Sequence, residues 1–223
     1  MKSKRIMKIS TDIFMTGILL LSMGYALWGD FMHEVFGVIL FALFIIHHIL
    51  NMNWYKAMLK GKYSPYRVFI LVLNIPLTLC VIGLMTSGIM MSKHIFAFMD
   101  INSGMSFARL LHLSVSHWSF VIMSLHIGLH INPVVQKAIK KNEHTKVILI
   151  VISILISVFG IYAFIKRDFA DYMFLKTQFA FMDFNELPIV FYIEHIAIMG
   201  LFIVTSYYFS KCLKSKCKSD KVM

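Results

Sequence analysis

Long runs of apolar residues, separated by short polar segments, dominate the chain. Six runs stand out, at residues 12–29, 33–54, 67–91, 107–131, 146–165 and 187–209. Each is close to the ~20 residues that a helix needs to cross about 30 Å of hydrocarbon. The pattern therefore predicts an all-α integral membrane protein, a bundle of six transmembrane helices.

The composition agrees with a membrane protein. Of the 223 residues, 59% are hydrophobic and only 15% are charged, and the mean hydropathy is +0.75. A soluble domain of this length normally carries more charge. The first apolar run follows a basic segment, as a secretory leader does, but no small-x-small cleavage site comes after it. We therefore expect an uncleaved first helix.

The basic residues gather in alternate connecting segments. One side holds 17 of the 22 Lys and Arg residues: Lys2, Lys4, Arg5, Lys8, Lys56, Lys60, Lys62, Arg67, Lys137, Lys140, Lys141, Lys146, Lys211, Lys214, Lys216, Lys218 and Lys221. The other side holds Lys93, Arg109, Lys166, Arg167 and Lys176. The positive-inside rule then predicts a multi-pass protein of the cytoplasmic membrane with both termini in the cytoplasm. The net charge of +11 thus indicates orientation in membrane lipid, and we expect no nucleic-acid binding.

Four histidines in these runs share a repeated spacing. His33 and His47 are 14 residues apart, and so are His112 and His126. Fourteen residues fall about 40° short of four helical turns, so each pair lies on one helix face, about 21 Å apart along the axis. The second and fourth spans run in the same direction. His33 can therefore face His112 in the outer leaflet, and His47 can face His126 in the inner leaflet.

Paired imidazoles from different helices are the axial ligands of low-spin b-type haem. The spacing therefore predicts two non-covalent, bis-histidine haem b groups in a four-helix core formed by residues 1–131. No C-x-x-C-H motif indicates covalent attachment. Residues 132–210 would add two further helices to the bundle, and residues 211–223 a basic cytoplasmic tail.

Other polar or small residues fit around this core. Arg109, just before His112, is expected to pair with the propionates of the outer haem, and Lys93 is a second option. Gly37 and Ser119 would let a porphyrin approach the helix backbone, although ordinary helix packing explains them equally well.

The remaining histidines leave several roles open. His130, one turn after His126, is an alternative ligand, a propionate partner or part of a quinone site. His117 and His130 form an alternative ligand pair for the fourth span, but they are about 140° out of phase and require a distorted helix. His195 follows Glu194 inside the last span, so it is a candidate for function or for a structural hydrogen bond.

Two other interpretations use the same residues without haem. The histidines can serve as hydrogen-bonding groups between helices, as in a haem-free membrane scaffold or transporter. A zinc site at His126 and His130 lacks both a third ligand and the glutamate of a metalloprotease helix. Neither a G-x-G-x-x-G nor a Walker-type loop is present, so a nucleotide-binding domain is not indicated.

Three stretches resemble the flavinylation-associated cytochromes, a family of bacterial membrane proteins. They are HEVFGVILFALFIIHHILNMNWY, KGKYSPYR and HLSVSHWSFVIMSLHIGLH, and the resemblance covers the first four spans well and the last two loosely. The residues on the family pattern are His33, His47, Asn51, Trp54, His112, His126 and His130. The resemblance implies b-type haem, electron transfer across the membrane, and a link to extracytoplasmic proteins that carry covalently attached flavin.

Together these patterns predict a diheme membrane cytochrome that passes electrons from the quinone pool, with menaquinol or another quinol as substrate, to an extracytoplasmic flavoprotein or other acceptor. The alternative is a transmembrane reductase that acts directly on a small acceptor such as ferric iron. One-electron transfer needs no catalytic acid or base. If quinol is oxidised on this chain, His130, Glu194 and His195 are the candidates. Homo- or hetero-oligomeric assembly is left open.

Overall fold

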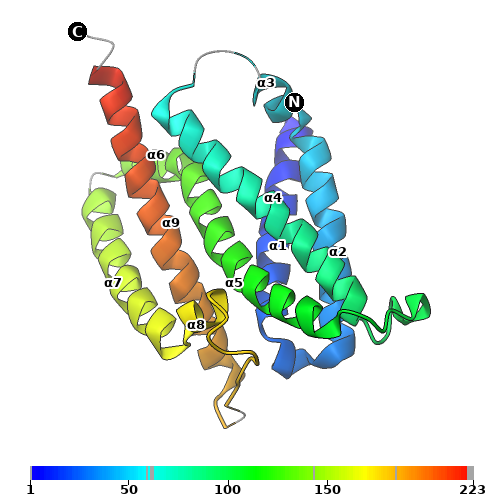
Figure 1. The fold of residues 1–223 in the computed structure, drawn as a ribbon. Helices are drawn as coiled ribbons and strands as arrows, with labels where there is room; N and C mark the ends of the chain where they lie inside the picture. The colour runs from blue at the N-terminus through cyan, green and yellow to red at the C-terminus, as the bar shows by residue number, and fades with distance from the viewer. Residues whose placement is uncertain (1, 59, 61–62, 143, 184, 220–223) are drawn as a thin grey trace. The chain divides into compact units, whose positions relative to one another are not determined.

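The computed structural model describes residues 2–58, 60, 63–142, 144–183 and 185–219, and every regular element in these ranges is helical (Figure 1). The elements are α1 (Lys2–Met23), α2 (Tyr25–Leu50), α3 (Met52–Met58), α4 (Pro65–Met91), η1 (Ala97–Met99), α5 (Met105–His130), α6 (Asn132–Lys141), α7 (His144–Lys166), α8 (Phe169–Met173) and α9 (Pro188–Ser219). Within the described residues, six helices are long and apolar enough to cross a membrane: α1, α2, α4, α5, α7 and α9. The prediction of an all-α, six-span membrane protein is confirmed. Lys62 and residues 220–223 lie outside the described residues.

The boundary between the first two helices differs from the prediction. The apolar pattern placed residues 24–29 in the first span, but α1 ends at Met23 and these residues belong to the start of α2. Gly29 interrupts the helix there, with a φ of 75° that side chains other than glycine rarely adopt. This break lies directly before residues 30–32, the predicted gap between the first two apolar runs, which Asp30 opens.

Local signals explain the other helix ends. Pro65 begins α4, and the Ser64 hydroxyl oxygen accepts a 3.3 Å hydrogen bond from the Arg67 amide, as a helix cap does. Asn51 ends α2, and its backbone amide bonds the His47 carbonyl at 3.0 Å. Helix α9 continues to Ser219, through most of the segment expected to be a separate tail.

The chain divides into two compact units, which are described separately. The first unit comprises Met1–Lys62 and Val81–His112, and the second comprises Tyr63–Cys80 and Leu113–Met223. The division passes through α4 and α5. It therefore divides the predicted segment 1–131 and places part of it in one unit with residues 132–210.

In the first unit, α1 and α2 lie side by side (Figure 1). No residue of α2 is buried, and on α1 Thr11 and Leu19 are buried. Near the start of α2, Glu34 fixes the segment that follows α4. Its carboxylate accepts hydrogen bonds from the Ser92 hydroxyl and from the backbone amides of Lys93 and Ile95, at 2.7–2.8 Å.

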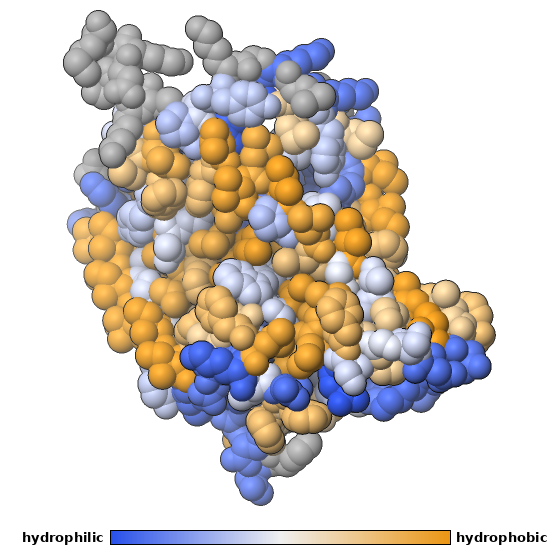
Figure 2. Space-filling view, viewed as in Figure 1, coloured by the Kyte–Doolittle hydropathy of each residue, from blue (hydrophilic) through white to orange (hydrophobic). Residues whose placement is uncertain are grey.

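In the second unit, α7 and α9 pack closely through small residues. A Cβ added to Gly160 would lie 2.5 Å from the Ala197 carbonyl oxygen and 2.7 Å from the Leu201 Cβ. Such close approach of backbones is typical of membrane helices with small residues at their interface. The outer side of α7 exposes a row of isoleucine and valine side chains, and Figure 2 shows this apolar surface along the helix. Lipid is the contact that such a surface favours.

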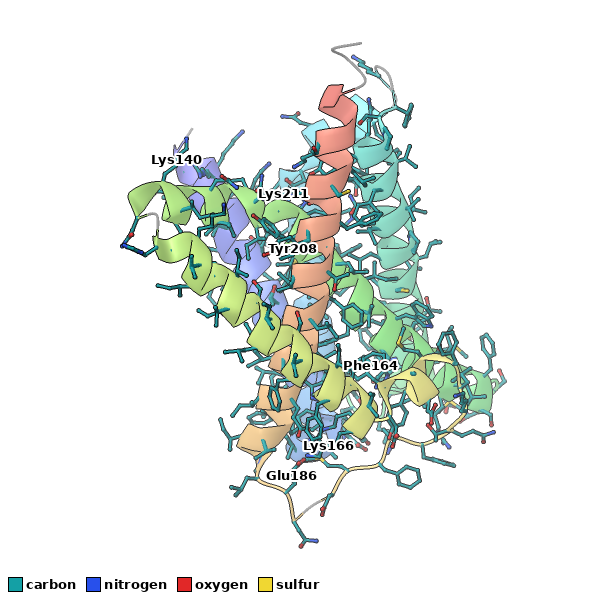
Figure 3. All side chains as sticks on the ribbon, turned by 90° about the vertical axis from the view of Figure 1, so that its left-hand side faces the viewer. Lys140, Phe164, Lys166, Glu186, Tyr208 and Lys211 are labelled. Carbon is teal, nitrogen blue, oxygen red and sulfur yellow. The ribbon has the colours of Figure 1, made fainter. Side chains whose placement is uncertain are left out.

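Charged residues of the second unit lie at opposite ends of its helices. Figure 3 shows Lys140 and Lys211 near one end of the helices, and Lys166 and Glu186 near the opposite end. The short helix α6, which carries Lys137 and Lys140, follows directly after the end of α5. The structure thus separates within this unit the two groups of charges that the positive-inside rule assigned to opposite membrane faces.

Candidate functional site

The first unit brings His33 of α2 and His112 of α5 together. Their ring centroids are 5.9 Å apart, with an angle of 67° between the ring planes. The two residues come from helices far apart in the sequence, and both were predicted as ligands of one haem from their spacings alone. The structure therefore brings together one of the two predicted imidazole pairs.

His112 is held by a hydroxyl on α4. The Ser87 Oγ atom lies 3.0 Å from the His112 Nδ1 atom and 2.6 Å from the Gly83 carbonyl oxygen. Because the hydroxyl has one hydrogen, which the carbonyl accepts, Ser87 must accept the Nδ1 hydrogen of His112. The Nε2 atom of His112 then carries a free lone pair, as a metal ligand needs.

His33 has an unsatisfied nitrogen. Among the described residues, no hydrogen bond of ordinary geometry reaches its buried Nδ1 atom, although the Ser22 carbonyl lies near the ring. A buried polar atom without a partner is uncommon and calls for an explanation. Gly37 lies one turn further along the same face of α2, and a Cβ added there would meet nothing within 4 Å. There is thus open space at Gly37, one helical turn from a nitrogen that lacks a partner.

These residues fit a bis-histidine haem. Two imidazoles on opposite sides of one metal ion, each through a nitrogen about 2 Å from the metal, have ring centroids roughly 6 Å apart. The observed separation of His33 and His112 is close to that value. Two imidazoles suffice, because a porphyrin supplies the other four ligands of the iron. Among the described residues, no three His, Cys, Asp or Glu side chains gather as a metal site of their own.

His47, the second predicted ligand on α2, is bonded to a carboxylate. Its Nδ1 atom lies 2.7 Å from the Asp12 Oδ1 atom on α1. A carboxylate only accepts, so Nδ1 carries a hydrogen, and in the neutral imidazole Nε2 then carries the lone pair. Both side chains retain contact with the surroundings, since 25% of His47 and 52% of Asp12 is exposed.

Asn51, one turn after His47, extends this cluster. Its side-chain amide donates a 2.8 Å hydrogen bond to the His47 carbonyl and lies 3.4 Å from the His47 Nε2 atom. Lys8 of α1 donates a 2.9 Å hydrogen bond to the Asn51 Oδ1 atom. Trp54 follows on α3, where its ring packs edge-on against Tyr55. Asn51 therefore supports His47, whereas Trp54 has no described contact with a predicted ligand.

The second unit holds His126, the second predicted ligand on α5. Its Nδ1 atom lies 2.7 Å from the Asn74 Oδ1 atom of α4. An amide oxygen only accepts, so His126 has the same tautomer as His47 and His112. His130 is exposed at the end of α5, and its ring lies 4.8 Å from that of His126. Because His47 and His126 belong to different units, each is described by its own contacts.

The other enclosed histidines are bonded within their own helices. The Nδ1 atoms of His48, His117 and His195 lie 2.8–2.9 Å from the carbonyl oxygen four residues earlier. The His117 ring also packs against Phe169 and Tyr172, with centroids 4.7 and 4.8 Å away. These contacts favour a structural role for His117 rather than its pairing with the exposed His130.

The candidate propionate partners differ in their contacts. Lys93 donates a 2.6 Å hydrogen bond to Asp30, which holds the pKa of the Lys93 ammonium above its usual range. Arg109 is exposed on the first turns of α5, three residues before His112. Ser119 is buried and donates to the Ser116 carbonyl at 2.9 Å, so packing accounts for it.

Glu194 belongs to an ion-pair network at the end of α7 and α9. Lys166 bonds Glu194 at 2.6 Å and Glu186 at 3.1 Å, and Arg167 bonds both carboxylates as well. Burial raises the pKa of Glu186, but hydrogen bonds from Arg167 and Lys166 outweigh burial and hold that pKa below its usual value of 4.5. Two cations balance two anions here, so the network explains Glu194 structurally.

Three residues of the site were not anticipated from the sequence: Asp12, Asn74 and Ser87. Asp12 and Asn74 carried a signal, because an acid or amide inside an apolar run is a functional candidate by default. Ser87 carried none, since hydroxyls are common in membrane helices. No protein-family model, curated protein sequence or solved structure matches the chain, so the site is assigned from its own geometry.

Proposed function

We propose that the chain is a diheme b-type cytochrome of the cytoplasmic membrane. It carries electrons from quinol, with menaquinol as the candidate, to an extracytoplasmic flavoprotein or other acceptor. The observation that carries the proposal is the way the histidines are held. His47, His112 and His126 each bond a polar side chain of another helix through Nδ1, and the His33 ring, whose Nδ1 atom is unsatisfied, lies 5.9 Å from the His112 ring.

The chain's own residues would do four things. His33 and His112 would hold the outer haem, and the repeated spacing assigns the inner haem to His47 and His126. Asp12, Ser87 and Asn74 would orient the imidazoles by accepting their Nδ1 hydrogens. The apolar helices would exclude water, and Arg109 would pair with propionates. Each haem, when bound, supplies an iron that takes up and returns one electron.

The proposed oxidation of quinol and reduction of flavin balance in electrons and protons. Oxidation of one quinol releases two electrons and two protons, and reduction of one flavin outside takes up two of each. His130 lies beside His126 at the end of α5 that the charge pattern assigns to the cytoplasmic side. It is therefore the residue we propose at the quinol site, in preference to Glu194 and His195, whose bonds are already accounted for.

A difference spectrum of the full chain, purified in detergent, tests the proposal. We expect a sharp b-type α-band on reduction and two haems per chain in a pyridine haemochrome assay. Colourless protein that is folded and monodisperse would overturn the proposal and leave the scaffold or transporter interpretation. The spectrum also separates non-covalent from covalent haem, since acid acetone extracts only the former.

Proteoliposomes test the direction and the partners of transfer. With a menaquinol analogue supplied in the membrane, ferricyanide or an exported flavoprotein outside should be reduced only when haem-loaded protein is present. Equal reduction of a ferric chelate in the absence of any flavoprotein would favour the transmembrane reductase alternative. No reduction of any external acceptor by a haem-loaded chain would contradict transfer across the membrane.

A further inference from the structure

The predicted ligands of the first unit receive unequal hydrogen bonds. His47 bonds a carboxylate, with 2.7 Å between its Nδ1 atom and the Asp12 Oδ1 atom. His112 bonds the neutral Ser87 hydroxyl at 3.0 Å, and the Nδ1 atom of His33 has no hydrogen bond within the described residues. The three imidazoles differ in this respect although the residue type is the same.

A carboxylate partner changes an imidazole more than a hydroxyl does. A hydrogen bond to an ionised acceptor is roughly twice as strong as one between neutral groups. It draws the Nδ1 hydrogen toward the acceptor and makes Nε2 the more basic nitrogen. A more basic axial ligand favours the oxidised iron, so the reduction potential falls. Solvent screens the charge of the half-exposed Asp12, but it does not remove a direct hydrogen bond.

We propose that Asp12 is a positioning residue, which fixes His47 with its hydrogen on Nδ1 and gives the haem held by His47 a lower reduction potential than the haem held by His33 and His112. This inference rests on the proposed function. It deepens that function by assigning a direction, because an electron shared between the two haems then resides more often at the outer one.

Lys8 acts in the opposite sense and must be separated from Asp12. Its ammonium reaches Asn51 at 2.9 Å, and Asn51 in turn contacts His47. A nearby positive charge favours the reduced iron and raises the potential. Lys8 bonds Asn51 rather than an imidazole nitrogen, so we expect the direct carboxylate bond to have the larger effect.

A potentiometric titration of the haem-loaded full chain, followed in the α-band, measures the two potentials. We expect two one-electron waves, and His33→Ala should abolish the upper one. Asp12→Asn should raise the potential of the lower wave and leave the upper wave in place. Asp12→Glu should largely keep the wild-type potential of the lower wave, and Lys8→Met should lower that potential slightly. Asp100→Asn is the matched control, because Asp100 lies in a loop of the same unit, where its carboxylate bonds Asn102. It should move neither wave.

Two results would overturn the proposal: loss of the lower wave in His33→Ala, or an unmoved lower wave in Asp12→Asn. ¹⁵N NMR of histidine-labelled full chain supplies a readout that does not need haem. His47, assigned with His47→Gln, should carry its hydrogen on Nδ1 in the wild type and shift toward Nε2–H in Asp12→Ala. A colourless chain would end the proposed function while this tautomer remains measurable. If the protein does bind haem, an unchanged tautomer in the haem-stripped chain would end the inference alone.

Discussion

The helix pair α1–α2 in the first unit and the pair α7–α9 in the second are held together in different ways. Between α7 and α9, glycine and alanine let the backbones approach, and two cations bond two carboxylates at one end. Between α1 and α2, the described polar bonds join Asp12 to His47 and Lys8 to Asn51, and no α2 residue is buried.

The difference separates packing from function. The ion-paired groups at the end of α7 and α9 satisfy one another, so these charges need no further partner. On α1, Asp12 bonds the His47 imidazole. Among the described contacts, the second nitrogen of that ring lies 3.4 Å from the Asn51 amide. Polar side chains inside a membrane are unfavourable unless they are paired or used. Substitutions between α7 and α9 should therefore reduce stability and leave haem binding intact. Substitutions around the predicted ligands should weaken haem binding with little loss of stability.

The largest effect on stability is expected from Glu194→Gln. Glu194 is 3% exposed and bonds both Lys166 and Arg167, so the change leaves two cations sharing Glu186. Breaking a buried pair in this way destabilises by about 3 kcal/mol. Equilibrium unfolding in mixed detergent micelles measures this loss in the free energy of unfolding. The exposed pair of Asp171 and Lys176 offers the control, and Asp171→Asn should change the unfolding free energy by less than about 1 kcal/mol.

Gly160→Leu should destabilise the same interface by about 1–3 kcal/mol, because the new side chain would overlap the α9 backbone. Gly17→Leu on α1 is the matched control, since a Cβ there meets nothing within 4 Å. The unfolding free energy should fall only for Gly160→Leu. Equal losses for the two glycine variants would contradict the close packing of α7 on α9.

Ser87→Ala should weaken haem binding without a comparable loss of stability. It removes the acceptor of the His112 Nδ1 hydrogen, and loss of such a supporting contact typically lowers metal affinity 10–100-fold. Titration of haem into the stripped full chain measures the affinity. Thr86→Val is the control, because the Thr86 hydroxyl bonds only the Ile82 carbonyl of its own helix. Unchanged haem affinity in Ser87→Ala would argue against His112 as a ligand.

The smallest effect concerns pH. The folded-state pKa of Glu186 is lowered, so its contribution to stability is present above its usual value of 4.5 and is lost as the pH falls through the folded pKa. The thermal midpoint of the wild type should therefore exceed that of Glu186→Gln at neutral pH. The two midpoints should converge below about pH 4. A constant difference across this range would show that Arg167 and Lys166 do not act through the Glu186 charge.

The histidine spacing predicted which rings meet, but not what supports them. His33 and His112 could be paired from the sequence because a helix converts residue spacing into face and depth. Ser87 and Asn74 could not be found in this way, because a bond between helices depends on how each helix is rotated. Asp12 was placed at the start of the first span and given no role, although an acid within an apolar run already suggested one.

Helix existence was predicted more reliably than helix ends. Six apolar runs gave six helices, yet α1 ends at Met23, before the end of the first run, and the backbone is broken again at Gly29 inside α2. The sequence made Glu194 and His195 candidates for quinol oxidation, and it left a structural hydrogen bond equally open for His195. Their cation and carbonyl partners, which come from the loop after α7 and from α9 itself, show that the same residues can complete a fold.

The pairing of the four histidines tests the central claim most directly. Haem content per chain should fall from two to one in His33→Ala, in His112→Ala and in the double variant alike, because both residues hold the same haem. Combining His33→Ala with His47→Ala should remove both haems, while His48→Ala, His117→Ala and His195→Ala should keep two. Two haems retained in His33→Ala or His112→Ala, or one lost in His117→Ala instead, would contradict the account.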